Sequence, residues 1–126
     1  MAELLRGEIY YIKFPYTFDR RYPDGKSKFV LVLQEGEYFK DYDTVEVLLI
    51  TSDSESKGFL TNVTIEKGTT LLKIESYIVC AQPYPVRRTL FEEHNVWCAG
   101  KLSPEKMDEV DEAIYIGLCM DHQNIE

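Results

Sequence analysis

The sequence has few cysteines, and none of them is paired at a metal-binding spacing. Cys80, Cys98 and Cys119 form no CxxC pair, so the pattern indicates neither a disulfide framework nor a zinc knuckle. A reducing compartment, the cytoplasm, fits this cysteine usage. We interpret all three as buried, unreactive thiols, because two fall in predicted strands and Cys119 falls near the end of a predicted helix.

Long apolar segments are also missing. The N-terminal segment Met-Ala-Glu-Leu-Leu-Arg-Gly-Glu lacks the apolar core of a signal peptide. The longest uncharged stretch, Ser76–Val86, contains two prolines and is too short to span a bilayer. We therefore expect a chain that is neither secreted nor inserted in a membrane.

Familiar catalytic constellations are missing as well. The sequence contains no Gly-rich phosphate loop, no GxSxG, no HExxH and no paired His/Cys spacing, so we predict no metal and no cofactor. The two histidines, His94 and His122, lie in an acidic loop and in the C-terminal tail. We interpret both as exposed and solvated.

What is present is the composition of one folded domain. Hydrophobic residues make up 44% of the 126 residues, charged residues 29% and aromatic residues 13%. These values are typical of a globular protein that buries a core without disulfides or metals. We predict a single domain over residues 1–126.

The charge is negative overall but unevenly placed. A formal net charge of -8 argues against loose, non-specific nucleic-acid binding, which depends on concentrated lysine and arginine. Residues 13–28, however, carry five cations against two anions, whereas residues 92–126 carry nine acids against two lysines. The first region is suited to bind a phosphate and the second to repel it, although an uneven solvated surface is the alternative interpretation.

Short runs of apolar and β-branched residues, separated by turn residues, predict a mostly β domain. Phe29–Leu33 is continuously apolar, as expected for a strand buried on both faces, and Thr44–Thr51 is its expected partner. Between the first two strands, residues 15–28 form a long loop with Pro15, Pro23 and Asp24-Gly25. The predicted strands are Gly7–Phe14, Phe29–Leu33, Thr44–Thr51, Leu60–Ile65, Leu71–Val79 and Asn95–Lys101.

The pattern changes to a helical period near the C-terminus. Ser103 suits a helix N-cap, Pro104 the first helical position, and Glu105 the first turn. We predict a helix over residues 103–120 and a frayed tail over 121–126. The expected fold is a small barrel or sandwich of about five to seven strands with one C-terminal α-helix. The apolar stripe of the predicted helix is Met107, Val110, Ala113, Ile114, Gly117 and Leu118.

Two groups suited to phosphate binding are expected at one end of this sheet. Lys26 and Lys28 precede one predicted strand, and Thr51 and Ser52 end the next. If the two strands pair as a hairpin, the cations and the hydroxyls lie together. A cation and a hydroxyl donor bind a phosphate without a metal. A solvated strand end is the alternative.

Several segments also recur in a family order. Gly7–Tyr10, Lys28–Leu33, Ile50–Ser52 with Ser56–Phe59, Gly100–Ser103, Met107 and Val110–Ala113 together resemble the MazF/PemK-type toxins of bacterial toxin–antitoxin pairs. The resemblance covers about Arg6 to Met120. It implies an SH3-like β-barrel with a terminal helix and a homodimer. It further implies a growth-inhibiting, metal-independent endoribonuclease that cleaves single-stranded RNA and is neutralised by a cognate antitoxin peptide.

The resemblance also implies catalytic residues. The family pairs an arginine, usually in Arg-Pro before the second strand, with a threonine at the end of the third. Thr51 matches the threonine, whereas Lys28 stands at the arginine position and Phe29 at the proline position. On this hypothesis the ribose 2′-OH attacks the adjacent phosphorus, Lys28 stabilises the developing charge and Thr51 holds a non-bridging oxygen.

The remaining site candidates lie on or beside the long loop. Asp24 is the candidate general base, and Arg20 or Arg21 is a candidate to replace the missing arginine. The loop tyrosines are candidates to stack on RNA bases, with packing beneath the loop as the alternative. The predicted substrate-binding residues are Arg20, Arg21, Lys26, Ser52, Tyr16 and Tyr22.

Two other functions stay open at this point. Because lysine is a point charge and arginine a planar fork, Lys28 is compatible with a binding module that has lost cleavage. Such a module uses the same site to bind a peptide or nucleic acid. A third interpretation directs the same fold at a protein such as a topoisomerase, although no residue favours it.

Overall fold

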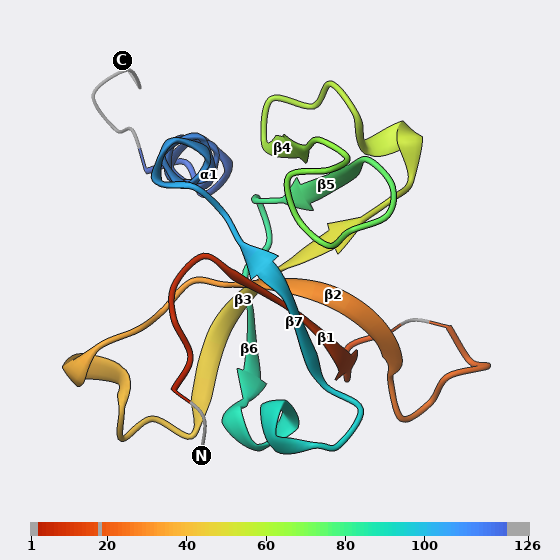
Figure 1. The fold of residues 1–126 in the computed structure, drawn as a ribbon, viewed down its shortest axis with the longest axis vertical. Helices are drawn as coiled ribbons and strands as arrows, with labels where there is room; N and C mark the ends of the chain where they lie inside the picture. Colours follow the sequence, from red (N-terminus) through yellow and green to blue (C-terminus); the bar gives the residue numbers. More distant parts are fainter. Residues whose placement is uncertain (1–2, 18, 121–126) are drawn as a thin grey trace.

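The computed structural model describes residues 3–17 and 19–120. Seven strands form one antiparallel sheet that curls on itself, and within the described ranges one α-helix lies over its upper end (Figure 1). The predicted fold class, mostly β with a C-terminal helix, is confirmed. The elements are β1 (Glu8–Phe14), β2 (Lys26–Val32), β3 (Thr44–Thr51), β4 (Asn62–Ile65), β5 (Ser76–Val79), β6 (Tyr84–Arg87), β7 (Trp97–Lys101) and α1 (Pro104–Gly117).

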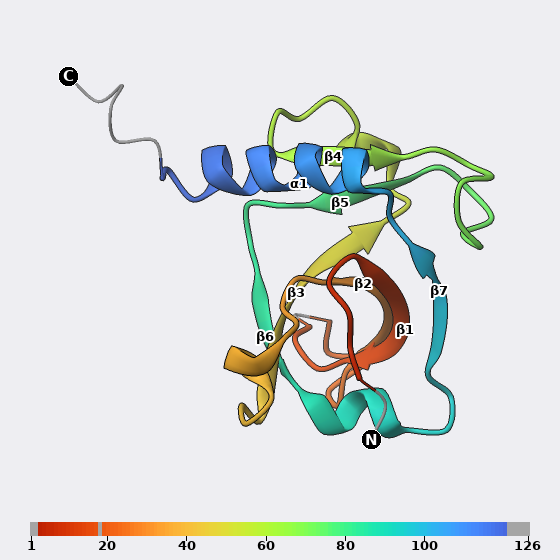
Figure 2. The same ribbon diagram turned by 60° about the vertical axis from the view of Figure 1, so that its left-hand side comes forward.

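The sheet is organised around β3. The strand order is β4-β5-β3-β2-β1-β7, and β6 pairs with β3 outside this path. The first half of β3 pairs with β6, with Val47 opposite Tyr84, and its last residue, Thr51, lies opposite Tyr77 of β5. One long strand therefore joins the upper layer of β4, β5 and α1 to the lower, curled part (Figure 2).

The central strands are buried on both faces. Val30, Leu31 and Val32 of β2 are fully buried, and successive residues point to opposite faces of the sheet. Leu31 joins the core that packs against α1, and Val30 and Val32 join a second core inside the curl. The prediction that this strand is buried on both faces is confirmed.

The helix begins as predicted but ends earlier. Ser103 Oγ accepts a hydrogen bond of 3.1 Å from the backbone N–H of Lys106, which confirms the N-cap. A Cβ placed at Gly117 would lie 2.9 Å from Ala81 Cα, so the last turn passes close to the chain after β5. Leu118 is 44% exposed and does not complete the predicted apolar stripe. Residues 121–126 lie outside the described part.

Among the differences from the predicted strands, three concern β2, the segment 71–75 and β6. β2 begins at Lys26, which pairs with Phe14, so Lys26 and Lys28 belong to a strand and the loop ends earlier. The segment 71–75 is not a strand, although Leu71 N–H donates to Ala99 O at 2.8 Å. β6 was missed because it contains Pro85, which is tolerated where a strand lies at a sheet edge.

The prediction of three buried cysteines is wrong for two of them. Cys80 is buried, and burial raises the pKa of its thiol to about 12. Cys98 on β7 and Cys119 after α1 are exposed. His94 is exposed, as predicted, and His122 lies outside the described residues.

Candidate functional site

The end of the β2–β3 hairpin brings the predicted cation and hydroxyls together. Phe29 lies opposite Ile50, so the next pair in the register is Lys28 with Thr51. The antiparallel pairing expected from the sequence is confirmed. It follows that the start of β2 and the end of β3 lie at the same end of this hairpin.

A hollow of about 270 Å³ lies at this end of the hairpin. Lys28, Thr51 and Ser52 line it, and the hydroxyls of Ser27 and Ser76 add further polar groups. One cation among hydroxyl donors is suited to hold a phosphate. The other lining residues are Tyr11, Phe29, Ile50, Leu72 and Ile74.

The local structure orients the Thr51 hydroxyl. Its Oγ1 accepts a hydrogen bond of 3.1 Å from the backbone N–H of Asp53. Asp53 in turn accepts a hydrogen bond from Glu55 N–H at 3.0 Å and begins the short 3-10 turn Ser54–Ser56. Because Thr51 Oγ1 uses a lone pair for Asp53, its own hydrogen is left to donate to a ligand oxygen.

The carboxylate beside the hollow, Glu75, is already engaged. Tyr77 Oη donates to Glu75 Oε1 at 2.7 Å, and Lys57 Nζ lies 3.3 Å from the same oxygen. These partners, Tyr77 first, lower the pKa of Glu75. Among the described residues, those that line the hollow include no carboxylate and no histidine.

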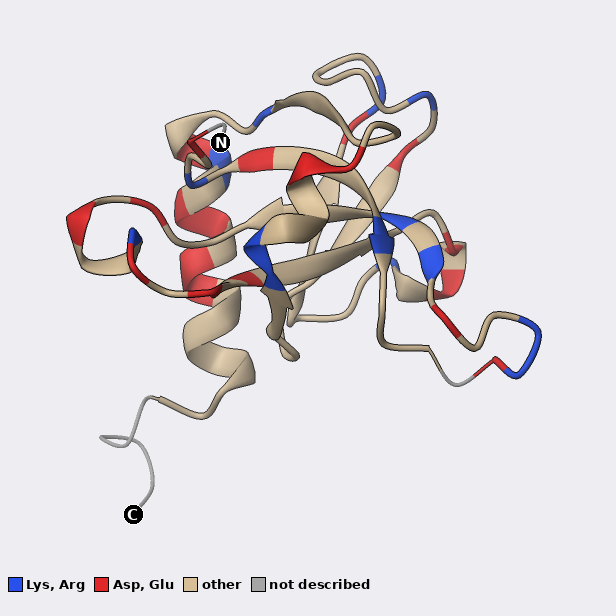
Figure 3. Ribbon diagram, turned by 90° about the horizontal axis from the view of Figure 1, so that it is seen from below, with Lys and Arg blue, Asp and Glu red and all other residues tan. Residues whose placement is uncertain are grey.

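The loop candidates lie apart from this hollow. The loop from Pro15 to Gly25 projects from the barrel, and it carries basic residues at its tip (Figures 1 and 3). Arg21 Nη2 lies 2.8 Å from Asp19 Oδ2, and this hydrogen-bonded contact lowers the pKa of Asp19. Lys26 Nζ lies 5.0 Å from the centre of the Tyr22 ring. Arg20, Arg21, Asp24, Lys26 and Tyr22 are not among the residues that line the hollow.

Tyr16 is packed rather than free. Its ring stacks on Tyr84 at a centroid distance of 5.5 Å, and its Oη donates to Pro85 O at 2.6 Å. Both partners belong to β6, so Tyr16 fixes the start of the loop to this strand. The packing alternative therefore describes Tyr16 better than base stacking does.

An aromatic group beside the hollow was not predicted from the sequence. Tyr11, Phe29 and Trp97 come from β1, β2 and β7, and their ring centroids are 4.8 to 6.0 Å apart. Each residue fits an ordinary strand pattern on its own. The register, with Tyr11 opposite both Phe29 and Trp97, is the signal that joins them.

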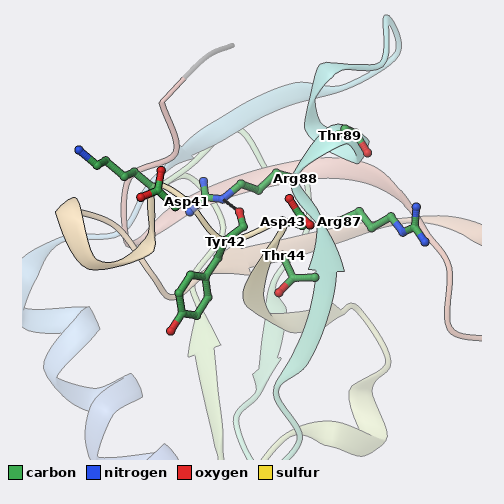
Figure 4. A pocket seen from close by; sticks show the side chains of 8 residues that line it. Asp41, Tyr42, Asp43, Thr44, Arg87, Arg88 and Thr89 are labelled. Atoms are coloured by element: carbon green, nitrogen blue, oxygen red, sulfur yellow. Dashed lines mark hydrogen bonds between the residues drawn. The ribbon is translucent and has the colours of Figure 1, made fainter.

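A larger hollow of about 540 Å³ lies at the opposite end of β3, beside Thr44 (Figure 4). Arg88 spans its wall, donating from Nε to Tyr42 O at 2.8 Å and from Nη2 to Phe39 O at 2.5 Å. These bonds hold the segment before β3 against β6. Acidic and basic side chains are mixed around it, and the two acids oppose the binding of a phosphate: Lys40, Asp41, Asp43, Arg87 and Arg88.

Within the described ranges, no three His, Cys, Asp or Glu residues are grouped so that they could hold a metal ion. The same part of the chain contains no helix with the length and apolar character to cross a membrane.

Comparison with known protein families assigns the chain to one of them. Residues 5–118 match the model of the PemK-like, MazF-like toxins of type II toxin–antitoxin systems. The chain belongs to the PemK/MazF-like toxin family. A search of curated proteins finds no match.

Solved structures of MazF-like toxins share the fold. A mycobacterial endoribonuclease in complex with its cognate antitoxin aligns with a TM-score of 0.70 at 15% identity, over 93% of this chain and 96% of that chain. The Mycobacterium tuberculosis toxin MazF-mt6 aligns with a TM-score of 0.68 at 19% identity, over 90% and 98%. MazF from Deinococcus radiodurans aligns with a TM-score of 0.70 at 15% identity, over 95% and 100%.

The resemblance to this family implies a catalytic pair, a threonine and an arginine, for the chain. Thr51 lies at the end of β3, and Lys28 lies where the resemblance places an arginine. Phe29, at the proline position, belongs to the aromatic group. The two departures that the resemblance implies, at residues 28 and 29, therefore lie in the hollow and in the aromatic group beside it.

Proposed function

We propose that this MazF-like toxin is a metal-independent endoribonuclease that cleaves single-stranded RNA in the hollow at the end of the β2–β3 hairpin. The observation that carries the proposal is that Lys28, Thr51 and Ser52 line one hollow. The names of two structural relatives, both called endoribonuclease, support the same activity.

The chemistry is an in-line displacement at phosphorus. The ribose 2′-oxygen forms a bond to phosphorus, the bond from phosphorus to the 5′-oxygen breaks, and a 2′,3′-cyclic phosphate and a 5′-hydroxyl result. Lys28 neutralises the charge that develops on the phosphoryl oxygens, and the Thr51 hydroxyl donates to one of them. Such donors are worth most where they are fixed before the reaction, as the Thr51–Asp53 contact fixes Thr51.

Proton transfer needs a group from outside the lining residues described above. A threonine hydroxyl is a poor base, and the lysine serves as the electrostatic clamp or as the acid that protonates the leaving 5′-oxygen. Asp24, on the loop that leads into β2, stays our prediction for the base. Asp24→Asn is expected to reduce the cleavage rate and to leave RNA binding unchanged, and equal rates would remove Asp24 from the mechanism.

The principal test is cleavage of an unstructured RNA in the presence of EDTA. Thr51→Ala and Lys28→Ala are each expected to lower the rate by about 100-fold or more, because each removes a donor to the transition state. Lys28→Arg is expected to keep or raise the rate, since a planar fork grips two phosphoryl oxygens. Thr44→Ala, at the other end of β3, is the matched control and is expected to cleave normally.

A binding module without cleavage is the second candidate, and the lysine at position 28 is the observation that favours it. Wild-type protein that binds RNA and yields no fragments would contradict the ribonuclease proposal and support this one. Cleavage that resists EDTA and disappears in both alanine variants would exclude the binding module.

We also propose the partners and setting that go with this function. The chain acts in the cytoplasm as a homodimer, inhibits growth, and is neutralised by a cognate antitoxin peptide; relatives solved with antitoxins support the last point. Sedimentation at micromolar concentration tests the dimer, and a monomer there would contradict it. Co-expression with the product of the adjacent reading frame tests the antitoxin by restored growth.

A further inference from the structure

The aromatic group beside the proposed cleavage hollow forms a continuous surface on one face of the sheet. Phe29 is 4.8 Å from Tyr11 and 5.6 Å from Trp97 between ring centroids, and Tyr11 is 6.0 Å from Trp97. The three residues occupy neighbouring strands in the order β2, β1, β7. We call Tyr11, Phe29 and Trp97 the aromatic platform.

The aromatic platform is open to solvent at one end. Trp97 is 43% exposed, and Tyr11 and Phe29 are half-buried. Phe29 packs against the core beneath α1, which anchors the platform from below. A large aromatic side chain held rigidly at the surface offers contact area at little entropic cost.

Two hollows adjoin the aromatic platform. The proposed cleavage hollow and a second hollow of about 110 Å³ share Tyr11 and Ser27 in their walls. His94 and Asn95, just before β7, line the second hollow and supply polar groups that can hydrogen-bond the edge of a base. The two hollows are therefore neighbours on either side of one aromatic ring system.

Each hollow also carries a cation. Lys28 lines the first and Lys13 the second, and Lys13 lies opposite Ser27 in the β1–β2 register. Glu93 lines the second hollow as well, so one carboxylate accompanies Lys13 there. Aromatic faces for bases and lysines for phosphates are the two elements with which proteins hold single-stranded nucleic acid.

We propose that the aromatic platform stacks an unpaired base of the nucleotide next to the cleaved phosphate, with Lys13 on the following phosphate and His94 and Asn95 on the base edge. This inference rests on the proposed ribonuclease function and adds the subsite that selects single-stranded RNA. A base pair inside a duplex does not offer a free face to Trp97, so double-stranded RNA is excluded from this subsite.

Trp97 is the chain's one tryptophan and reports directly on stacking. The probe is a 2′-O-methyl RNA oligonucleotide, which lacks the attacking hydroxyl and is bound without being cut. We expect saturable quenching of the tryptophan fluorescence by this oligonucleotide. An abasic oligonucleotide with the same number of phosphates is expected to bind about five- to 150-fold more weakly and to leave the fluorescence unchanged.

Substitution of Trp97 tests the contribution of this side chain to RNA binding. Trp97→Ala is expected to weaken binding of a labelled 2′-O-methyl oligonucleotide, followed by anisotropy, by a factor within the same range of about five to 150. Tyr115→Ala on α1 is the matched control, because Tyr115 is also 43% exposed and lies on another element. It is expected to bind as the wild type does.

These measurements separate the subsite from the proposed function. Normal cleavage by Trp97→Ala, with unchanged binding, would overturn the subsite and leave the ribonuclease intact. Quenched, base-dependent binding by a protein that never cuts would overturn the ribonuclease and keep the subsite. Quenching that follows protein concentration instead of RNA would show that a second copy covers the platform, and this would overturn the inference.

Discussion

At the scale of single residues, Gly25 shapes the entry to β2 and hence the position of Lys28. Gly25 has a φ of +110° and is buried. A Cβ at this position would lie 2.5 Å from Phe14 O. The chain therefore turns into β2 through a point that admits no side chain, next to the pair formed by Phe14 and Lys26.

Gly25→Ala is expected to destabilise the fold by more than the cost of a left-handed conformation, which is about 1–2 kcal/mol for an L-residue. The additional cost comes from displacing the Phe14 carbonyl. Gly36→Ala is the control, because Gly36 has a φ of +97° with nothing within 4 Å of an added Cβ. Urea unfolding of both variants measures the difference, and equal losses of unfolding free energy would contradict the steric argument.

The sequence predicts the location of some residues at the candidate site and not of others. Lys28 and Thr51 were predictable because each stands at the end of an apolar run, and the two runs pair. The aromatic platform was not predictable, because Tyr11 and Trp97 are 86 positions apart and meet through the β1–β7 register, which contains a bulge between Ile9 and Tyr10. The partner of Tyr16 was not predictable either, because β6 was itself missed.

At the scale of elements, Lys106 links α1 to the upper layer. Its Nζ lies 3.1 Å from Glu66 Oε1, just after β4, and 3.4 Å from Glu109 Oε2 one turn along the helix. The pKa of Lys106 is raised; its partial burial opposes this shift, and Glu66 and Glu109 outweigh it. The hydrogen bond from Lys106 lowers the pKa of Glu66.

The ion pair between Lys106 and Glu66 predicts a pH-dependent contribution to the free energy of unfolding. Because the pKa of Glu66 is below its ordinary value of 4.5 in the folded state, the contribution is present above pH 4.5 and is lost as the pH falls through the folded pKa. Lys106→Met is expected to cost up to about 1 kcal/mol at pH 7, because the Glu66 side chain is 54% exposed and solvent screens the pair, and less at pH 3. Lys67→Met, an exposed lysine beside Glu66, is the control. A loss that does not depend on pH would contradict the ion-pair assignment.

Sequence patterns predict the ends of helices and strands where local residues decide them, and fail where contacts with other segments do. The helix start followed from Ser103 and Pro104, which act locally. The helix end did not, because Gly117 meets Ala81 of another segment. β6 escaped prediction because proline normally argues against a strand, and the edge position that permits Pro85 is set by its pairing with β3.

At the scale of the whole molecule, the charges are separated by element. Acidic residues form bands along α1, whereas basic residues occur at the tip of the loop before β2 and on the strands near it (Figure 3). The net charge of -8 disfavours RNA in general, and Lys13 and Lys28 favour it at the two hollows that share Tyr11 and Ser27. Binding at these hollows should therefore depend on a few identifiable cations.

The salt dependence of RNA binding tests this division. Each phosphate neutralised on a single strand contributes about 0.7 to the slope of log K against log salt concentration. Lys13→Ala is therefore expected to weaken the binding of 2′-O-methyl RNA and to reduce the slope by about 0.7, because one released counterion is lost. Lys67→Ala, which removes an exposed lysine after β4, is expected to leave the slope unchanged. An unchanged slope in Lys13→Ala would mean that Lys13 contacts no phosphate, so that the single strand would have to leave the cleavage hollow by another path.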